Sequence, residues 1–542
     1  MRETGQSPWY KDAVFYEVYV RAFSDSNGDG HGDLPGLTQK LDYLQDLGVD
    51  VIWLLPIYPS PLKDDGYDIS DYYGILPEYG TLNDFREFID AAHQRGMRVI
   101  TDLVLNHTSN QHAWFQAART DPDSPYREYY VWSDTDRKYQ AARIIFTDTE
   151  DSNWTWDEQA GQYFWHRFYS SQPDLNYDNP AVQDEMIKIM RFWLDLGIDG
   201  FRADAVPYLY EREGTDCENL PQTHAYLKRI RRFIDENYPG RILLAEANQW
   251  PEDVLPYFGD GDEFHMGFHF PIMPRLYMAL RQSNTKPLVD ILARTPPIPQ
   301  TNQWCIFLRN HDELTLEMVT EAEREWMWQE YASDPRMRLN LGIRRRLATL
   351  LDNDERKIAL MNSLLFTLAG SPIIYYGDEI GMGDNIWLSD RNGVRTPMQW
   401  NDQMNAGFST ADESKLYAPV VSDAVYGYTK VNVADQQSDS GSLFWLIHRM
   451  IAVRKQHRVI GSGDFTWVSC GTEQVAAYLR SSPAEQLLIV NNLSASTQAI
   501  KCLVTHWQDG VLHDLLTGAQ FPVDGGGLAL TLAPYQYLWL AR

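Results

Sequence analysis

The sequence predicts an α/β protein whose main domain is an eight-stranded barrel of alternating strands and helices. Eight short apolar runs have the character of buried strands, and each is followed by a stretch with helical periodicity. The chain has 542 residues, of which 44% are hydrophobic, so it can form a large barrel and a further domain. A parallel sheet of eight such units closes most economically as a (β/α)8 TIM barrel, whose active sites lie at the carboxyl ends of the strands.

The candidate strands follow one another from the N-terminus. They are residues 14–20, 51–55, 99–105, 200–204, 242–246, 263–268, 304–311 and 372–376. Amphipathic stretches between them predict helices, among them 34–47, 82–94, 182–196, 224–237 and 356–368. The last helix of the barrel is predicted at 442–457. The repeat is one of architecture and not of sequence, which excludes a solenoid.

Three intervals are too long to be simple connections between a strand and a helix. They follow the third, seventh and eighth strands, and loops of such length usually carry function. After the last barrel helix the pattern changes to short alternating strands, which predicts an all-β sandwich domain. The expected boundaries are 1–106 and 178–457 for the barrel, 107–177 for an inserted subdomain B, about 313–354 and 381–439 for two further insertions, and 458–542 for the C-terminal domain.

The composition narrows the classes of partner. A formal net charge of −28 makes nucleic acid and anionic membrane surfaces poor partners. Aromatic residues make up 13% of the chain, and flat rings are what sugars stack against, although they could equally be core residues. The N-terminus carries no apolar signal segment and no apolar run reads as a membrane span, so we expect a cytoplasmic protein.

The four cysteines are Cys217, Cys305, Cys470 and Cys502, which are far apart and form no CxxC pair. This spacing indicates neither a zinc site nor a disulfide framework. We therefore expect buried thiols, as is typical of a cytoplasmic protein.

Charged and amide side chains stand at the ends of four predicted strands. They are Asn106 and His107 after the third, Arg202 and Asp204 in the fourth, Glu246 at the end of the fifth, and His311 and Asp312 after the seventh. An Asp after a strand is often only a helix N-cap. Three carboxylates from three strands at one mouth of a barrel, beside an arginine and two histidines, predict a catalytic site.

These motifs resemble those of glycoside hydrolase family 13, the α-amylase superfamily. The chain carries Asp-Xaa-Xaa-Xaa-Asn-His at 102–107, Gly-Phe-Arg-Xaa-Asp at 200–204, the strand-end Glu246 and Asn-His-Asp at 310–312, in the order of that family. Gln-Pro-Asp-Leu-Asn at 172–176 and Gly-Ser-Pro-Ile-Ile-Tyr-Tyr-Gly-Asp-Glu at 370–379 match further family motifs. The resemblance runs from about residue 12 through the barrel and includes the C-terminal domain.

The resemblance implies a retaining mechanism in which Asp204 is the nucleophile, Glu246 the general acid and base, and Asp312 the group that grips the 2- and 3-hydroxyls. Retention requires two carboxyl groups about 5 to 5.5 Å apart. Arg202 stands two residues before Asp204 on the same strand face, so it can keep Asp204 ionised. The implied sugar-binding residues are Tyr67, Asp68, His107, Gln172, Arg202, His311 and Arg395, with Arg395 as the partner of Asp68.

Two sets of oxygen ligands indicate structural Ca²⁺. The loop after the first strand resembles the first half of an EF-hand, but Gly36 stands where the terminal Glu belongs. The family implies this site and a second one, for which an acidic turn and ordinary polar loops are the respective alternatives. The implied ligands are Asp25, Asn27, Asp29, the His31 carbonyl and Asp33 for the first, and Asn106, Asp174, Glu211 and the carbonyls of Tyr208 and Leu209 for the second. No organic cofactor is expected.

Some stretches point to one branch of the family. Ala205 follows the nucleophile and Glu313 follows Asp312, whereas oligo-1,6-glucosidases usually carry Val and Gln there. Residues 205–214, 217–221 and 381–388 resemble the members that isomerise maltose to trehalose. Candidate gates over their pocket are Tyr208, Asn248, Glu313 and Glu317. The last two lie one helical turn apart if their loop is helical, and a solvated helix face is an equal alternative for Glu317.

Three functions are therefore weighed. The first is isomerisation of maltose to trehalose with minor hydrolysis to glucose. The second is hydrolysis of α-glucosides, and the third is a barrel that binds sugar without catalysis, which is disfavoured because all three carboxylates are present. The expected partners are maltose, trehalose and glucose, with possible self-association through the C-terminal domain.

Overall fold

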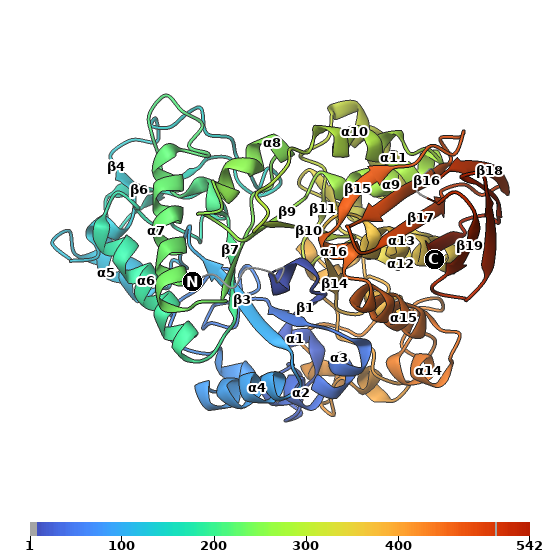
Figure 1. Cartoon of the computed structure of the whole chain (residues 1–542). Coiled ribbons are helices and arrows are strands. Elements are labelled where there is room, and N and C mark those ends of the chain that lie inside the picture. Colours follow the sequence, from blue (N-terminus) through green and yellow to red (C-terminus); the bar gives the residue numbers. More distant parts are fainter. Residues whose placement is uncertain (1–7, 505–506) are drawn as a thin grey trace.

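A closed barrel of eight parallel strands forms the centre of the computed structural model, which describes residues 8–504 and 507–542 (Figure 1). All eight predicted strands are confirmed, and β14 pairs with β1 to close the barrel. The strands are β1 (Phe15–Val18), β2 (Val51–Leu54), β3 (Arg98–Val104), β7 (Gly200–Asp204), β8 (Ile242–Ala245), β9 (Met266–Phe268), β10 (Gln303–Phe307) and β14 (Ser371–Tyr375).

Amphipathic helices cover the barrel. In α4 (Leu82–Gln94) a capping box between Thr81 and Asp84 fixes the start, and Phe85 and Phe88 are buried against the strands. The stretch predicted as one helix at 34–47 is two helices that meet at Lys40. The other helices around the barrel include α2 (Leu34–Gln39), α3 (Leu41–Leu47), α6 (Pro180–Asp195), α7 (Pro221–Asn237), α8 (Pro251–Val254), α9 (Ile272–Gln282), α10 (Lys286–Arg294), α13 (Glu355–Thr367) and α15 (Leu443–Gln456).

Subdomain B and the two later insertions extend from the carboxyl ends of the strands. Subdomain B contains α5 (Ala113–Thr120) and a small sheet of β4 (Trp132–Ser133), β6 (Gln162–Trp165) and β5 (Trp154–Asp157). The insertion after β10 contains β11 (Leu314–Thr315), α11 (Glu321–Tyr331), β12 (Arg338–Leu339), β13 (Gly342–Ile343) and α12 (Leu347–Leu350). The insertion after β14 is mainly loops and 3-10 turns before α14 (Val433–Ser438).

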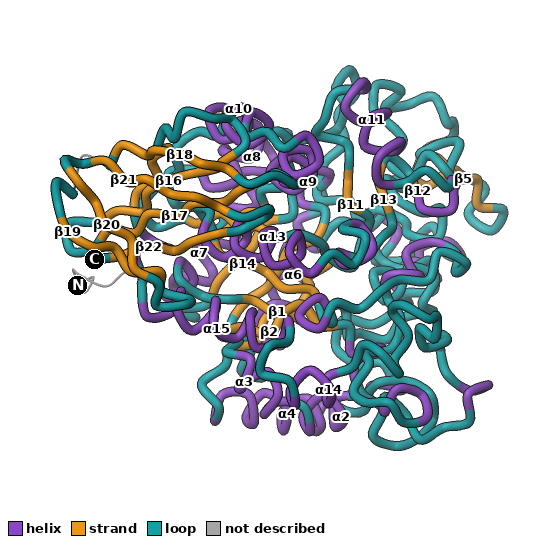
Figure 2. Tube along the Cα trace, turned by 90° about the vertical axis from the view of Figure 1, so that its right-hand side faces the viewer, coloured by secondary structure: helices purple, strands orange, loops and turns teal. Residues whose placement is uncertain are grey.

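The C-terminal domain is an antiparallel sheet that folds over its own core, and its strands lie at the left of Figure 2. Its strands are β15 (Asp464–Trp467), β16 (Val475–Ser481), β17 (Gln486–Asn492), β18 (Gln498–Leu503), β19 (Gly510–Asp514), β20 (Gln520–Asp524), β21 (Gly527–Leu532) and β22 (Tyr537–Ala541). The sequence pattern missed β19 and β20 because most of their residues are exposed or polar.

One face of this sheet packs on the barrel. Along β22, Leu538 and Leu540 point into the domain's own core while Trp539 points to the barrel core, as the two-residue period of a strand requires. The Trp539 indole donates to Ser363 Oγ on α13 at 2.9 Å. The buried Asn491 amide oxygen accepts from the same hydroxyl at 2.8 Å, so polar contacts fix the docking.

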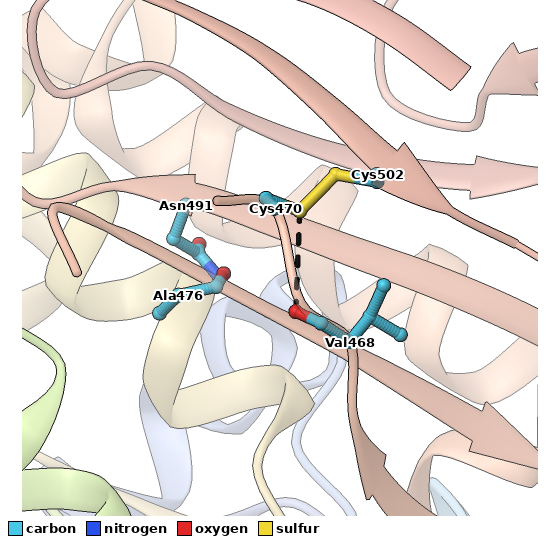
Figure 3. The surroundings of a disulfide bond; sticks show 5 residues. All are labelled: Val468, Cys470, Ala476, Asn491 and Cys502. Carbon is cyan, nitrogen blue, oxygen red and sulfur yellow. Dashed lines mark hydrogen bonds between the residues drawn. A yellow bond between two sulfur atoms is a disulfide. The ribbon is translucent and has the colours of Figure 1, made fainter. Parts of the chain in front are cut away.

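The sequence predicted that all four cysteines are free thiols, and this prediction was wrong for Cys470 and Cys502. Cys470, in the loop between β15 and β16, forms a disulfide with Cys502 on β18 (Figure 3). The two residues are 32 positions apart, and only the folding of the sheet over its core brings them together. Cys217 and Cys305 are free and buried, as expected. In the described part of the chain, no helix is both long and apolar enough to cross a bilayer.

Candidate active site

A cavity opens at the carboxyl ends of the barrel strands, where the strand-end motifs predicted it. Nine predicted site residues line it, and five others lie behind its wall. The lining residues that were predicted are Tyr67, His107, Asp204, Tyr208, Glu246, Asn248, Asp312, Glu313 and Glu317. Those not in the lining are Asp68, Gln172, Arg202, His311 and Arg395.

Arg202 connects the two carboxyl groups that the family pattern assigns to the chemistry. Its Nη1 lies 2.5 Å from Asp204 Oδ1 and 2.6 Å from Asp102 Oδ1, and its Nη2 lies 2.6 Å from Glu246 Oε1. Asp102, Arg202 and Asp204 belong to the neighbouring strands β3 and β7, whose parallel register places Asp102 beside Arg202. A buried guanidinium with planar donors is thus the element that fixes Asp204 and Glu246 relative to each other.

The two carboxyl groups differ in the surroundings that set the pKa of each. Burial raises the pKa of Glu246 to about 8, with Asp204 and Asp312 adding to the rise and Arg202 opposing it. Burial also raises the pKa of Asp204, but Arg202 counteracts this rise directly. Near neutral pH Glu246 therefore holds a proton that it can give to a leaving group. This pair has the division of roles that retaining glycoside chemistry needs.

Asp312 is held as an anion by three cations. Its Oδ1 lies 2.8 Å from Arg391 Nη1 and 3.2 Å from Arg395 Nη2, and its Oδ2 lies 3.1 Å from His311 Nε2. Burial opposes ionisation, but His311 and the two arginines hold the pKa of Asp312 well below its usual range. A fixed carboxylate of this kind can accept hydrogen bonds from sugar hydroxyls.

Tyr67 forms the base of the cavity. Its ring stacks on the His311 imidazole, with 5.4 Å between centroids and 10° between planes, and its hydroxyl lies 2.9 Å from His311 Nε2. On the other side, His107 Nε2 lies 3.2 Å from the Tyr67 carbonyl oxygen. Burial lowers the pKa of His107 to about 3, so this imidazole is neutral and can serve as a donor to a neutral sugar.

The pairing expected between Asp68 and Arg395 was wrong. Asp68 is fully buried behind the cavity, where it accepts from Ser60 Oγ at 2.8 Å and from the Lys63 and Asp64 amides. Arg395 instead pairs with Asp65 Oδ2 at 2.6 Å and also reaches Asp312.

The carboxylate that lines the cavity at this position is Asp64. Its Oδ1 lies 2.6 Å from Arg391 Nη2, and its Oδ2 accepts from Gln172 Nε2 at 2.9 Å. Gln172 therefore orients Asp64 from behind and does not itself line the cavity. Because Arg391 also binds Asp312, one guanidinium joins two carboxylates on the cavity wall.

Side chains from two insertions meet beside Glu317 and Tyr208, which line the cavity. Arg143 of subdomain B lies 2.7 Å from Glu317 Oε2 and 2.9 Å from Glu218 Oε1, and its Nη2 donates to the Tyr208 hydroxyl at 3.2 Å. Ile145, Phe146 and Phe168 form the apolar part of the same wall. Of the aromatic residues of segment 154–177, Phe168 lines the cavity, whereas Trp154 and Trp165 pack in a separate cluster.

Glu313 and Asn248 lie deeper in the cavity. The segment that carries Glu313 and Glu317 is not helical, because β11 occupies Leu314–Thr315 between them. Burial and Asp312 raise the pKa of Glu313 to about 7, although Arg391 opposes the rise. Asn248 donates to Thr315 Oγ1 at 3.2 Å, and its own carbonyl oxygen has no hydrogen-bond partner among the described residues.

The two predicted calcium sites differ in what the structure offers an ion. In the loop Asp25–Asp33, all three carboxylates already accept hydrogen bonds from neighbouring amides, including Gly30 N to Asp25 Oδ2 at 2.8 Å. At the second site, Asn106 Oδ1, Asp174 Oδ2 and Glu211 Oε1 are buried oxygens without any hydrogen-bond partner in the described chain. Among residues 8–504 and 507–542 no group of three or more His, Cys, Asp and Glu side chains is placed to hold a metal.

Sequence reasoning missed several functional residues. Asp64 and Asp65 stand beside Asp68 in one short motif, and nothing in that motif says which carboxylate faces the cavity. Arg391 lies in a 3-10 turn of the insertion after β14, four residues before the arginine that was expected. Arg143 lies in a segment of subdomain B without regular secondary structure. Arg391 and Arg143 are charged residues of long insertions, and Asp64 and Asp65 lie in the loop after β2; the sequence alone does not say where any of these side chains lies.

The barrel, the two carboxyl groups bridged by Arg202 and the fixed carboxylate Asp312 define a class, the enzymes that cleave or transfer glycosidic bonds. Residues 17–463 match the family described as alpha amylase, catalytic domain, and residues 465–539 match the C-terminal domain of maltogenic amylase. The chain therefore belongs to the α-amylase family.

Individual relatives narrow this class. A trehalose synthase/amylase from Mycolicibacterium smegmatis is 58% identical over 98% of this chain and 92% of its own length. An oligo-1,6-glucosidase from Parageobacillus thermoglucosidasius is 31% identical over 91% of this chain and 92% of its own. Among solved structures, the trehalulose synthase from Pseudomonas mesoacidophila superposes with a TM-score of 0.80 at 28% identity, covering 99% of this chain and 100% of that one.

Proposed function

We propose that this protein isomerises maltose to trehalose by intramolecular transfer of a glucosyl group, with minor hydrolysis to glucose. The observation that carries the proposal is the pair Asp204 and Glu246, two carboxyl groups that line one cavity and are bridged by Arg202, with Glu317 of the same lining paired to Arg143 of subdomain B. Such a cavity can keep a released glucose inside and water outside while a covalent intermediate exists. The 58% identity to a trehalose synthase/amylase and the 56% identity to a trehalose synthase from Pimelobacter sp. support this specificity over that of an oligo-1,6-glucosidase, to which the identity is 31%.

In the first step, Asp204 attacks the anomeric carbon of the non-reducing glucose. The bond from that carbon to O4 of the second glucose breaks while Glu246 gives its proton to O4. A β-glucosyl ester on Asp204 and a free glucose result. Positive charge on the ring is greatest in this transition state, where the fixed anions Asp204 and Asp312 stabilise it most.

In the second step, the free glucose turns within the closed cavity and presents its anomeric hydroxyl. Glu246, now a carboxylate, removes the proton of this hydroxyl while its oxygen attacks the anomeric carbon of the ester. The ester bond to Asp204 breaks, and an α,α-1,1 linkage forms. Two inversions give net retention at the transferred glucose. Tyr208, Asn248, Glu313 and Glu317 surround the space in which the free glucose would turn.

An α-glucosidase is the second candidate, because its chemistry needs the same carboxyl groups. It is favoured only by the likeness to an oligo-1,6-glucosidase at 31% identity. Hydrolysis would follow if water reached the ester before the free glucose did. The two activities therefore differ in the acceptor and not in the first step.

The deciding experiment is incubation of purified protein with unlabelled maltose and an excess of ¹³C-glucose. We expect trehalose as the main product, without label, because the acceptor glucose never leaves the cavity. Labelled trehalose would indicate that the acceptor exchanges with solvent. Glucose alone, without trehalose, would contradict isomerisation and support the hydrolase.

Calcium is proposed as a structural ion. The second site fits it well, because Asn106, Asp174 and Glu211 offer three buried oxygens without hydrogen-bond partners, and oxygen is the ligand that Ca²⁺ prefers. The loop Asp25–Asp33 fits less well, since hydrogen bonds within the loop already occupy its two buried carboxylates. From the sequence, the loop Asp25–Asp33 was the stronger candidate for a calcium site. The oxygens without hydrogen-bond partners make the second site the stronger candidate for this proposal.

The remaining expectations concern partners and location. Maltose, trehalose and glucose are the proposed small-molecule partners, in line with solved mutants of the trehalulose synthase that hold isomaltulose or glucose. A cytoplasmic location stays a proposal, and the Cys470–Cys502 disulfide is unusual for a reducing compartment. Self-association through the C-terminal domain is likewise a proposal, which sedimentation at several protein concentrations tests.

A further inference from the structure

Glu17 on β1 is a fully buried carboxylate that the proposed mechanism does not use. Its Oε1 lies 2.5 Å from His311 Nδ1 and 3.3 Å from the His311 backbone nitrogen. Its Oε2 has no hydrogen-bond partner among the described residues. A carboxylate is costly to bury unless it is paired, so its position against His311 requires an explanation.

The imidazole of His311 lies between two carboxylates. Nδ1 faces Glu17, whereas Nε2 faces Asp312 Oδ2 at 3.1 Å and the Tyr67 hydroxyl at 2.9 Å. A carboxylate can only accept, so both ring nitrogens must donate. Only the imidazolium carries two N–H groups, and the geometry therefore fits the protonated ring.

We propose that Glu17 is a positioning residue that keeps His311 protonated and oriented, so that His311 in turn holds Asp312 in place for the sugar hydroxyls. This inference rests on the proposed function of the cavity, but it concerns the first step, which isomerisation and hydrolysis share. Glu17 touches neither the cavity lining nor a reacting atom. Its effect therefore passes through His311 and Asp312.

The other charged groups around His311 do not replace Glu17. Asp102 on β3 contributes at longer range, the Tyr67 phenol is neutral near pH 7, and Arg395 donates its Nε to the His311 carbonyl oxygen at 2.9 Å. Burial would lower the pKa of His311, but Asp312 and Glu17 together raise it to about 9. Loss of Glu17 removes one of these two anions, so the ring should release its proton at a lower pH.

The test is Glu17→Gln, with the rate of maltose consumption compared with wild type between pH 5.5 and 9. At a pH below the lowered His311 pKa of the variant, His311 is protonated in both enzymes, so we expect their rates to agree within about threefold. Near pH 8 His311 is protonated only in wild type, so the wild-type rate should exceed that of the variant by more than about tenfold. Loss of the Glu246 proton lowers the rate of both enzymes, so it does not change the ratio of the Glu17→Gln rate to the wild-type rate. Maltose consumption counts trehalose and glucose alike, so the result is independent of whether isomerisation itself is confirmed.

Two further variants separate positioning from packing. Glu17→Asp retains the charge, so its ratio to wild type should stay constant with pH even if its rate is lower. Glu379→Gln changes another fully buried Glu, which accepts from Tyr16 and Tyr43 at 2.7 and 2.6 Å, and it should give a ratio that does not vary with pH. A constant ratio for Glu17→Gln across the whole range would overturn the proposal.

A direct measurement covers the case in which Glu17→Gln reduces stability. In protein labelled with ¹³C at the imidazole carbons, His311→Gln identifies the His311 signal, and its titration can be followed in wild type and in Glu17→Gln. We expect the His311 pKa to fall by about two units or more in the variant, because a tenfold rate difference at pH 8 requires a shift of that size from a wild-type value of about 9. An unchanged pKa would show that Glu17 only fills space.

Discussion

Arg143 Nη1 lies 2.7 Å from Glu317 Oε2, so that a side chain of subdomain B and one of the insertion after β10 meet over the cavity. The same guanidinium contacts Glu218 and the Tyr208 hydroxyl. Glu317 belongs to the insertion after β10, whereas Glu218 and Tyr208 both belong to the segment between β7 and α7, and Arg143 joins these two segments. A contact of this kind can open to admit maltose and close again before the ester forms.

Glu317→Gln should raise the share of glucose among the products. The amide loses the charge that attracts Arg143, so the mouth should stay open longer and admit water to the ester. We expect the glucose fraction to rise several-fold while total maltose consumption changes less, because Asp204 and Glu246 are untouched. Chromatography of trehalose and glucose at early time points measures both quantities.

A matched control is Asp157→Asn, which removes the charge from another ion pair of subdomain B, 2.8 Å from Arg119 and away from the cavity. This variant should leave the product ratio unchanged. If both variants raise the glucose share equally, general loosening of subdomain B and not the mouth contact controls water entry.

The rate should fall as pH rises through about 8. Glu246 has a raised pKa of about 8, so it is protonated below that value and can act as the acid, whereas above it the proton is lost.

In Glu246→Gln the first step should slow by about a thousandfold or more with maltose. α-Glucosyl fluoride needs no proton on its leaving group, so its first step should be much less affected. Equal losses with both substrates would contradict the role of Glu246 as acid.

The carboxylates at the strand ends could be predicted because each follows directly on an apolar run. Asp204 and Glu246 therefore lie where the strand pattern placed them, beside Arg202. The sequence could not show in this way which of Asp64 and Asp68 faces the cavity, because both lie in one loop. In the folded loop, Asp64 lines the cavity and pairs with Arg391, whereas Asp68 accepts hydrogen bonds from the backbone amides of Lys63 and Asp64.

Contacts between distant segments are the part that the sequence pattern does not contain. Arg391 joins Asp64 and Asp312, which are 248 positions apart in the chain, and it comes from a third segment. The pairing of Cys470 with Cys502 likewise depends on how the sheet folds over its core. Strands β19 and β20 were missed for a local reason, since Leu512 and Val523 are their only buried apolar residues and most of the others are exposed or polar.

Arg391→Lys should weaken both substrate binding and the first step. A lysine supplies one point charge and cannot hold Asp64 and Asp312 at the same time, as the planar guanidinium does at 2.6 and 2.8 Å. We expect a loss in kcat/KM of about a hundredfold, which corresponds to about 2.7 kcal/mol. Arg395→Lys, whose side chain pairs mainly with Asp65, should lose less. The reverse order would show that Arg395 is the more important partner of Asp312.

Removal of calcium should lower thermal stability. Without the ion, the Asp174 and Glu211 oxygens stay buried with no partner, and bound calcium at a hundred times its Kd would contribute about 2.7 kcal/mol. We expect chelation to lower Tm by several degrees, and Glu211→Gln to abolish this effect. Asp29→Asn, in the exposed part of the loop Asp25–Asp33, reports on the other site. If only Asp29→Asn removes the response, calcium binds in the loop.

Reduction of the Cys470–Cys502 disulfide should destabilise the C-terminal domain without changing turnover. The bond joins residues 32 positions apart, and closing a loop of this size in the unfolded chain contributes about 3 to 4 kcal/mol. Denaturant unfolding of wild type with and without reductant should therefore differ in midpoint.

The variant with Cys470→Ser and Cys502→Ser should match reduced wild type and should not respond to reductant. Both residues lie outside the cavity, so the trehalose-forming rate under native conditions should remain. A variant as stable as oxidised wild type would show that packing of Cys470 and Cys502 against Leu488 and Val490, and not the bond, holds this part of the sheet together.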